Sequence, residues 1–269
     1  MLVVTVALLI SSCSSTSPGA RDTTATPPTT AAAAPTSTAP VESKFRLALA
    51  RVSAITTLGD SVPSGAACKC TPYPQLTAAN IARVTGHAVR SFNDSVAGFV
   101  SGDVIRQLQH DETAIRDVEK SDAVMIEVGA NDIAFSSSCG TDISCYVSKL
   151  PKVTSNITNI VARVRRLTAG RHITVVLLDY WSVWLGGRYA RARGPVYVGA
   201  ARAVTLAFGT ATRTIALDTG SVYVDLRTAF RGPDDDRDET KLLAGDGDHP
   251  NAEGHERIAD AIVRTLQTT

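Results

Sequence analysis

The stretch Gly59-Asp60-Ser61-Val62-Pro63 places a serine hydroxyl directly after a run of apolar and β-branched residues. That run, residues 54–58, is typical of a buried strand. A strand that ends in Gly-Asp-Ser must turn sharply, so Ser61 is expected at the carboxyl edge of a sheet, where open α/β folds bind ligands. An exposed serine on a tight turn, with free N–H groups beside it, suits a nucleophile. The tripeptide alone is a weak signal, because most such turns are structural.

A histidine near the other end of the chain supplies the base that such a serine needs. In the segment Gly245-Asp246-Gly247-Asp248-His249-Pro250, His249 can accept the Ser61 proton. A carboxylate three residues earlier, Asp246, can curl back and hold the second nitrogen of the imidazole ring. Asp248 is the alternative for that role. The segment therefore predicts a Ser-His-Asp site for acyl transfer.

Two further polar loops follow predicted strands and carry candidate donors for a developing oxyanion. One is Asn93-Asp94-Ser95-Val96-Ala97-Gly98, and the other is Gly129-Ala130-Asn131-Asp132. The N–H groups of Ser61 and Gly98 and the side-chain amide of Asn131 are expected to converge on one point. Gly98 suits that position because glycine lets the backbone approach a ligand closely.

Apolar segments alternate along the chain with segments of helical spacing. The predicted strands cover residues 54–58, 87–92, 122–128, 173–178 and 222–226. These strands are apolar on both faces, which predicts a parallel sheet that is covered on each side. We therefore expect one α/β domain over residues 43–269, a three-layer α/β/α sandwich around a parallel, roughly five-stranded sheet.

Several single residues in these elements have predicted roles. Residues 74–86 are expected to form a helix, with proline near its start and glycine at its end. Ser101 and Asn251 are predicted to be N-caps of later helices. After Asp122 at its start, Glu127 is the one charge in the strand at 122–128, so it is expected to face an edge of the sheet or a partner.

The first 42 residues differ in composition from the rest of the chain. Residues 1–10 are apolar and run into Ser11-Ser12-Cys13, which resembles the signal peptide and lipobox of a bacterial lipoprotein, although no Lys or Arg precedes the apolar run. In that interpretation residues 1–13 are the signal and Cys13 carries the lipid. The alternative is a buried or disordered segment with an incidental cysteine. Residues 14–42 are almost entirely Ser, Thr, Ala and Pro, which predicts a disordered linker.

Four cysteines remain beyond Cys13, and an even number in an exported domain favours disulfides. The favoured pairing joins Cys139 to Cys145 across a short loop and Cys68 to Cys70 as a local bridge. The alternative pairs Cys68 and Cys70 across to the other loop. The spacings Cys-Lys-Cys and Cys-x₅-Cys fit structural zinc poorly, so no metal is expected.

Composition and the remaining motifs limit the class of protein. A chain of 269 residues with 44% apolar content can bury one large core, and a net charge of +1 gives no electrostatic footprint for nucleic acid. Outside the N-terminus no apolar run reaches the length of a membrane span. Asp234-Asp235-Asp236 lacks the ligand spacing of a calcium loop, and His249 and His255 do not share a helical face. Trp181 and Trp184 are expected to pack in the core, with lining of an acyl or glycan pocket as the alternative.

In their order along the chain, the motifs resemble those of the SGNH hydrolases, also called GDSL esterases or lipases. Gly59-Asp60-Ser61-Val62 is similar to the first block of that family, with Val62 where the family name has Leu. Residues 93–98 and 129–132 are similar to the second and third blocks, and residues 246–250 to the fifth. The resemblance covers the whole globular domain and implies a flavodoxin-like fold. It also implies the site residues: nucleophile Ser61, base His249, orienting acid Asp246, and oxyanion donors Ser61, Gly98 and Asn131.

The resemblance implies a serine esterase that hydrolyses acetyl or other short-chain acyl esters through an acyl-enzyme, with no cofactor. The sequence has no long apolar lid segment, which favours short acyl groups over long-chain lipids. The alternatives are an acyltransferase that acts on envelope glycans and a non-catalytic, tethered binding protein. We expect the protein to be exported, as a cell-membrane lipoprotein or in the extracellular space or envelope. There it is expected to act as a monomer on a small-molecule or glycan ester, with no nucleic-acid partner and with membrane contact only through the lipid anchor.

Overall fold

Five parallel strands form the central sheet of the protein, for which a computed structural model describes residues 49–268. The strands are β1 (Ala54–Gly59), β2 (Arg90–Asn93), β3 (Ala123–Glu127), β4 (Thr174–Leu178) and β5 (Val222–Val224). Their order across the sheet is β2-β1-β3-β4-β5, and each neighbouring pair is parallel. All five predicted strands are confirmed. The strand order changes direction between β1 and β3, which is where open α/β sheets bind ligands.

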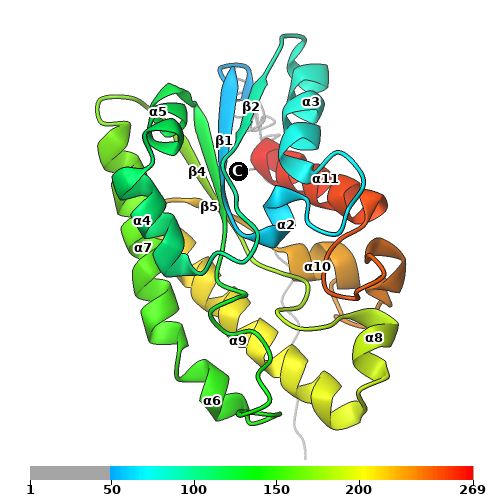
Figure 1. Ribbon diagram of the computed structural model, residues 1–269. Coiled ribbons are helices and arrows are strands. Elements are labelled where there is room, and N and C mark those ends of the chain that lie inside the picture. The colour runs from blue at the N-terminus through cyan, green and yellow to red at the C-terminus, as the bar shows by residue number, and fades with distance from the viewer. Residues whose placement is uncertain (1–48, 269) are drawn as a thin grey trace, which may run out of the picture. The chain divides into compact units, whose positions relative to one another are not determined.

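Helices cover both faces of the sheet, so the domain has three layers (Figure 1). One face carries α3 (Tyr73–Thr85), α10 (Leu226–Arg231) and α11 (Ala252–Thr268). The other carries α4 (Ser101–His110), α5 (Glu112–Lys120), α7 (Leu150–Leu167) and α9 (Pro195–Thr219). The connections contain four short elements, namely α2 (Ser61–Ser64), α6 (Ile143–Val147), α8 (Gly187–Arg191) and the 3₁₀ helix η1 (Glu239–Leu242). The predicted α/β/α sandwich is confirmed.

The sheet is a rigid base for the loops at its edge because its side chains are packed on both faces. Every residue of β1 and β3 is buried. Helix α7 adds an apolar stripe in which Val153, Ile157, Ile160 and Val164 are buried, at the spacing that one helical face requires. Burial of an apolar side chain of this size contributes about 1.5–3 kcal/mol, so these elements hold the strand ends in place.

Two of the predicted helix ends are confirmed and one is wrong. The side chain of Asn251 caps α11, because its Oδ1 accepts the N–H of Gly254 at 3.0 Å. Helix α3 ends at Gly86, which has a left-handed backbone. Ser101 is not an N-cap but the first residue of α4. Its N–H and its hydroxyl both donate to the Asp132 carboxylate, each at 2.8 Å, so a carboxylate from another loop replaces the predicted cap.

Glu127 faces no edge of the sheet, contrary to the prediction. It ends β3, a strand in the middle of the sheet, and its side chain is fully buried. Burial, and then the nearby carboxyl of Asp60, raise the pKa of Glu127 well above its usual value. A raised pKa favours the neutral carboxyl, which is far less costly to bury than a carboxylate.

Two disulfides join cysteines that lie close together in the sequence. Cys68 is joined to Cys70 and Cys139 to Cys145, which is the favoured pairing. Within residues 49–268 no helix combines the length and the apolar character that a bilayer span needs. The predicted signal peptide, the lipidated Cys13, the linker over 14–42 and the first residues of the predicted domain lie outside the described residues.

Candidate active site

Ser61 begins helix α2 directly after β1, at the carboxyl edge of the sheet. Asp60 fixes this turn: its Oδ1 accepts the N–H of Val62 at 3.2 Å, and its Oδ2 accepts the hydroxyl of Tyr180 at 2.5 Å. Gly59 is required because a Cβ there would overlap the carbonyl oxygen of Glu127 on the neighbouring strand. The N–H of Ser61 donates to no other group among residues 49–268, as expected at a helix start.

The loop after β2 is tied to the same turn. The Nδ2 of Asn93 donates to the carbonyl of Pro63 at 2.8 Å, and the N–H of Val96 donates to the carbonyl of Gly59 at 3.0 Å. Gly98 follows with φ of +86°, a left-handed backbone that favours glycine, and no atom lies within 4 Å of the place where its Cβ would stand. Its N–H donates to no group in the described part of the chain and is free for a ligand.

Asn131 comes from the loop after β3. Its Nδ2 donates one hydrogen to the carbonyl of Phe99 at 2.9 Å, which fixes the side chain. The amide nitrogen carries two hydrogens, so a second donor remains. The neighbouring Asp132 anchors this loop to the start of α4 through Ser101, and Asn156 donates to the Ser101 hydroxyl at 2.9 Å.

His249 lies in the loop that precedes α11, and Asp246 holds it from behind. The Nδ1 of His249 lies 2.8 Å from Oδ2 of Asp246, while Oδ1 of Asp246 accepts the N–H groups of Asp248 and His249 at 3.0 and 3.1 Å. Partial burial alone would raise the pKa of Asp246, but these N–H donors and the His249 ring hold it below its usual value. Asp246 therefore remains ionised, and the geometry favours it over Asp248 as the orienting acid. The His249 side chain keeps 19% of its surface exposed, so a substrate can reach it.

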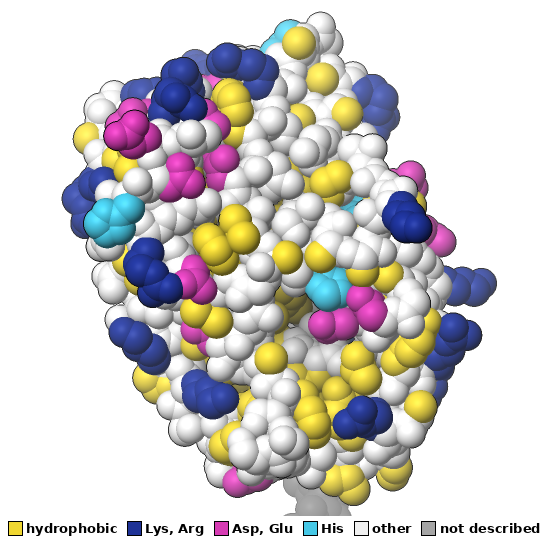
Figure 2. All heavy atoms as spheres, viewed as in Figure 1, with side chains coloured by type: hydrophobic (Ala, Val, Ile, Leu, Met, Phe, Trp, Pro, Cys, Tyr) yellow, Lys and Arg dark blue, Asp and Glu magenta, His cyan; other side chains and the backbone are white. Residues whose placement is uncertain are grey.

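A cavity of about 40 Å³ brings three of the predicted residues together: Ser61, Asn131 and His249. In the space-filling view, a hollow opens in the middle of the face shown, beside histidine and acidic side chains (Figure 2). Among the contacts of the described residues there is no hydrogen bond between Ser61 and His249. Gly98 is not among the residues that line the cavity. A serine hydroxyl, an imidazole and a side-chain amide thus surround one small space at the carboxyl edge of the sheet.

Tyr180 and Trp181 also line this cavity. Sequence reasoning did not assign Tyr180 a place in the site, and it gave pocket lining by Trp181 only as the alternative to core packing. Both follow β4 at the active edge of the sheet, which is the signal that was available. Tyr180 donates to Asp60, whose pKa burial raises to about 7 although this hydrogen bond opposes the shift. Trp181 is 2% exposed and stacks on Phe230 with ring centroids 4.3 Å apart, so it packs in the core and lines the cavity as well.

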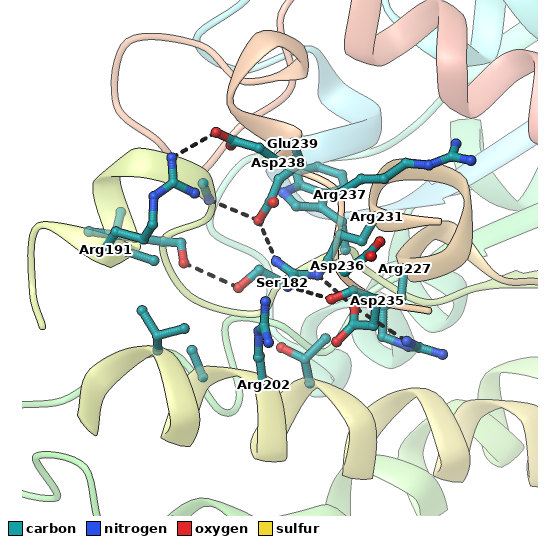
Figure 3. A pocket seen from close by; sticks show the side chains of 17 residues that line it. Ser182, Arg191, Arg202, Arg227, Arg231, Asp235, Asp236, Arg237, Asp238 and Glu239 are labelled. Carbon is teal, nitrogen blue, oxygen red and sulfur yellow. Dashed lines mark hydrogen bonds and ion pairs between the residues drawn. The ribbon is translucent and has the colours of Figure 1, made fainter. Parts of the chain in front are cut away.

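Trp184 packs as expected, with its indole N–H donating to the carbonyl of Ile133 at 3.0 Å. A second cavity, of about 170 Å³, shares Trp181 and Ser182 with the first. Arginine and acidic side chains from α8, α9, α10 and the loop before η1 surround it (Figure 3). Asp235 and Asp236, from the acidic run at 234–236, form part of this wall.

Metal-ligating side chains gather at one place within residues 49–268, where ligand atoms of Cys68, Cys70 and His255 lie within 4.8 Å of one another. The two sulfurs are already joined in a disulfide and supply no thiolates, which a metal would need. His255 is fully buried, burial lowers its pKa to about 4, and its Nδ1 accepts the N–H of Tyr73 at 3.3 Å. The hydrogen bond therefore ties the start of α3 to helix α11.

The fold and the cavity together define a hydrolase of the α/β type with a serine at a strand end. The model of the GDSL-like lipase/acylhydrolase family matches residues 57–257, which include every residue of the cavity. The chain belongs to this family and is a carboxylic ester hydrolase that acts on a small-molecule ester.

Solved structures of the same fold match this chain over most of their length. A lipase from a goat rumen metagenome is 15% identical and matches with a TM-score of 0.62 over 79% of this chain and 96% of its own. The extracellular lipase of Streptomyces rimosus is 21% identical, with a TM-score of 0.59 over 79% and 99%. An acetyl xylan esterase from Geobacillus stearothermophilus is 19% identical, with a TM-score of 0.55 over 80% and 94%. At these identities the similarity shows the fold. No curated protein sequence matches this chain.

Proposed function

We propose that the protein is a serine esterase for short acyl esters and that it works through an acyl-enzyme on Ser61. One observation carries the proposal: Ser61, Asn131 and His249 line a single cavity. On the other side of the imidazole ring, Oδ2 of Asp246 lies 2.8 Å from Nδ1 of His249. His249 is the general base, and Asp246 orients its ring and stabilises the charge that the ring gains.

The proposed reaction has two halves. The Ser61 oxygen attacks the ester carbonyl while the Nε2 of His249 takes the hydroxyl proton, and the carbonyl oxygen becomes an oxyanion. The intermediate collapses, the bond to the alcohol breaks, and His249 returns the proton to the departing alcohol. Water then attacks the acyl-enzyme with His249 again as base, which releases the acid and restores the serine.

Three donors hold the oxyanion in this mechanism: the N–H groups of Ser61 and Gly98 and the second amide hydrogen of Asn131. Their freedom supports the role, since the N–H groups of Ser61 and Gly98 donate to no other described group and Asn131 uses one hydrogen on Phe99. Donors that are fixed before the reaction begins need no reorganisation when charge develops.

The size of the cavity supports a short acyl group. A cavity of about 40 Å³ holds only a few water molecules, which suits acetyl better than a long chain. The test is a series of 4-nitrophenyl esters from acetyl to decanoyl, with kcat/KM expected to fall as the chain grows. Equal or rising values along the series would contradict the preference for short acyl groups.

Two other functions are separated by simple measurements. An acyltransferase would release the alcohol faster when a sugar acceptor is added and would form the acylated sugar. A tethered binding protein would bind an ester without releasing any alcohol. We expect release of the free acid, at a rate that does not depend on an added sugar.

We also propose that Cys13 anchors the protein to the membrane and that residues 14–42 serve as a linker to a monomeric domain. The apolar start and the serine and cysteine residues after it support this proposal. Cys13→Ser is expected to move the protein from the membrane fraction to the soluble fraction. A protein that remains in the membrane fraction would contradict the anchor.

A further inference from the structure

The second cavity lies next to the reacting centre and is built from charged side chains (Figure 3). It shares the side chains of Trp181 and Ser182 with the cavity that contains Ser61 and His249. Its volume is about 170 Å³, compared with about 40 Å³ for the first. When the short acyl group of an ester occupies the small cavity, the alcohol part of the ester must lie outside it. The larger cavity is the neighbouring space that can hold this alcohol part.

Most of the charges around this cavity neutralise one another. Arg231 pairs with Asp235 at 2.6 Å and with Glu239 at 2.7 Å. Arg191 pairs with Asp238 at 2.7 Å, and this bond comes first among the causes that lower the pKa of Asp238 to about 2. Asp238 is therefore ionised, and all three carboxylates are paired with arginine side chains.

Ion pairs also make the wall rigid. Glu239 is 1% exposed, and the oxygen that binds Arg231 also accepts the N–H of Gly187 at 2.8 Å. The N–H of Arg188 donates to the hydroxyl of Thr240 at the same distance. Three separate elements (α8, α10 and η1) are thereby held together around a preformed space, which lowers the entropy that a ligand loses on binding.

Arg202 is the exception in this balance. It extends from α9 toward the cavity, is exposed, and forms no ion pair with any residue from 49 to 268 (Figure 3). Arg237 and Asp236 are exposed as well and form no ion pair within residues 49–268, but their opposite charges cancel in the net charge of the wall. Of nine charged side chains that line the cavity, five are arginines and four are carboxylates, so Arg202 leaves it with an excess of positive charge.

Trp181 supplies a second unused donor. It is 2% exposed, and its indole N–H is buried without a hydrogen-bond partner in the described part of the chain. A buried donor with no acceptor costs about 1–3 kcal/mol, so such groups call for an explanation. The nitrogen has almost no surface open to the cavity, so recognition of a ligand there falls to Arg202.

We propose that the second cavity is the subsite for the alcohol part of the ester and that it selects alcohols with a carboxylate, which Arg202 binds. The guanidinium group has a planar pair of N–H donors that matches a carboxylate in two parallel hydrogen bonds. The inference rests on the proposed function, because it needs a short acyl group on Ser61 to place the alcohol at the neighbouring cavity.

Two acetyl esters of similar size test the proposal on the full-length protein: 4-acetoxybenzoate, which carries a carboxylate, and 4-methylphenyl acetate, which does not. For Arg202→Ala we expect KM for 4-acetoxybenzoate to rise about 10-fold, the lower end for a hydrogen bond to a charged group, because Arg202 is exposed. Its kcat, and both constants for the neutral ester, should change less than about 2-fold, since Arg202 contacts neither the nucleophile nor the base. The KM of Arg202→Lys for 4-acetoxybenzoate should lie between those of wild type and Arg202→Ala, since lysine keeps the charge and loses the paired donors.

Arg213 provides the matched control, because it is an exposed arginine on the same helix and does not line the cavity. Arg213→Ala should leave KM for 4-acetoxybenzoate unchanged. The subsite is overturned if Arg202→Ala and Arg213→Ala have the same KM for that ester while the neutral ester is still hydrolysed. Failure of the wild-type protein to hydrolyse either ester would instead overturn the proposed function, and the subsite with it.

Discussion

The Oδ2 atom of Asp246 lies 2.8 Å from Nδ1 of His249, three residues along the same loop. The other oxygen of Asp246 accepts the N–H groups of Asp248 and His249. A single carboxylate therefore sets both the backbone of the loop and the direction of the imidazole ring. Asp248 makes no such contact with the ring, although it lies next to His249 in the sequence and lines the cavity.

The first prediction separates these two aspartates. Asp246→Asn is expected to lower kcat by about 10²–10⁴, because an amide neither enforces the required tautomer nor stabilises the imidazolium. Asp248→Asn is the control and should retain activity within about 10-fold. The measurement is kcat for 4-nitrophenyl acetate in the three proteins. A larger loss from Asp248→Asn than from Asp246→Asn would reverse the assignment.

Asn131 allows a test of the oxyanion site. Asn131→Ala should lower kcat by about 10²–10³ and change KM little, because the donor acts on charge that is present only in the transition state. Asn156→Ala serves as a comparison, because it removes the donor to Ser101 in the supporting contacts without touching the cavity. Steady-state kinetics decide the matter, and a wild-type kcat in Asn131→Ala would exclude the amide from the oxyanion site.

Asp60 predicts a pH dependence of stability. Its pKa is raised to about 7 in the folded protein, mainly by burial, and the unfolded value is about 3.9. Between pH about 4 and about 7 the folded chain keeps a proton that the unfolded chain has lost. The free energy of unfolding therefore falls as pH rises through this window and levels off above it.

Asp60→Asn removes that titration. As pH rises through the window, wild type should lose unfolding free energy relative to the variant at about 1.4 kcal/mol per pH unit. The total relative loss should be at most about 4 kcal/mol. Asp179, with a pKa also raised to about 7 by burial, titrates in both proteins and cancels. Urea unfolding at several pH values measures the difference. Parallel curves for the two proteins would show that Asp60 is ionised throughout.

The wall of the second cavity predicts a contrast between two carboxylates. Glu239→Ala leaves the buried Arg231 with only Asp235 and leaves the N–H of Gly187 unpaired, so a loss of about 3–5 kcal/mol in unfolding free energy is expected. Asp238→Ala breaks a pair in which both side chains are more than half exposed, at 53% and 54%, and removes the cap that accepts the N–H of Thr240, so it should cost about 1–2 kcal/mol. Chemical denaturation compares the two, and equal losses would contradict this account of the wall.

The strands and the main site residues were predictable because their signals are local. Runs rich in apolar and β-branched residues marked β1, β3 and β4, and the polar turns after β1 and β3 placed Ser61 and Asn131 at one edge. His249 and Asp246 are three residues apart, so their contact needed no knowledge of the fold. The resemblance to a known family then assigned the roles.

Contacts between distant segments account for what the sequence did not predict. The Ser101 hydroxyl binds Asp132, 31 positions away, and Tyr180 binds Asp60 across 120 positions. Glu127 is buried because β3 lies between β1 and β4, and strand order is not visible in one strand. The second cavity is formed by four separate segments, none of which carries a recognisable motif.

The most direct test of the central claim is labelling of the full-length protein with a fluorophosphonate, followed by intact mass measurement. An activated serine should add one phosphonyl group, and Ser61→Ala should add none. Ser64→Ala removes a neighbouring hydroxyl that donates to the carbonyl of Ser61, and it should still be labelled. A folded wild-type protein that remains unlabelled, or a Ser61→Ala variant that is labelled equally, would contradict a nucleophilic role for Ser61.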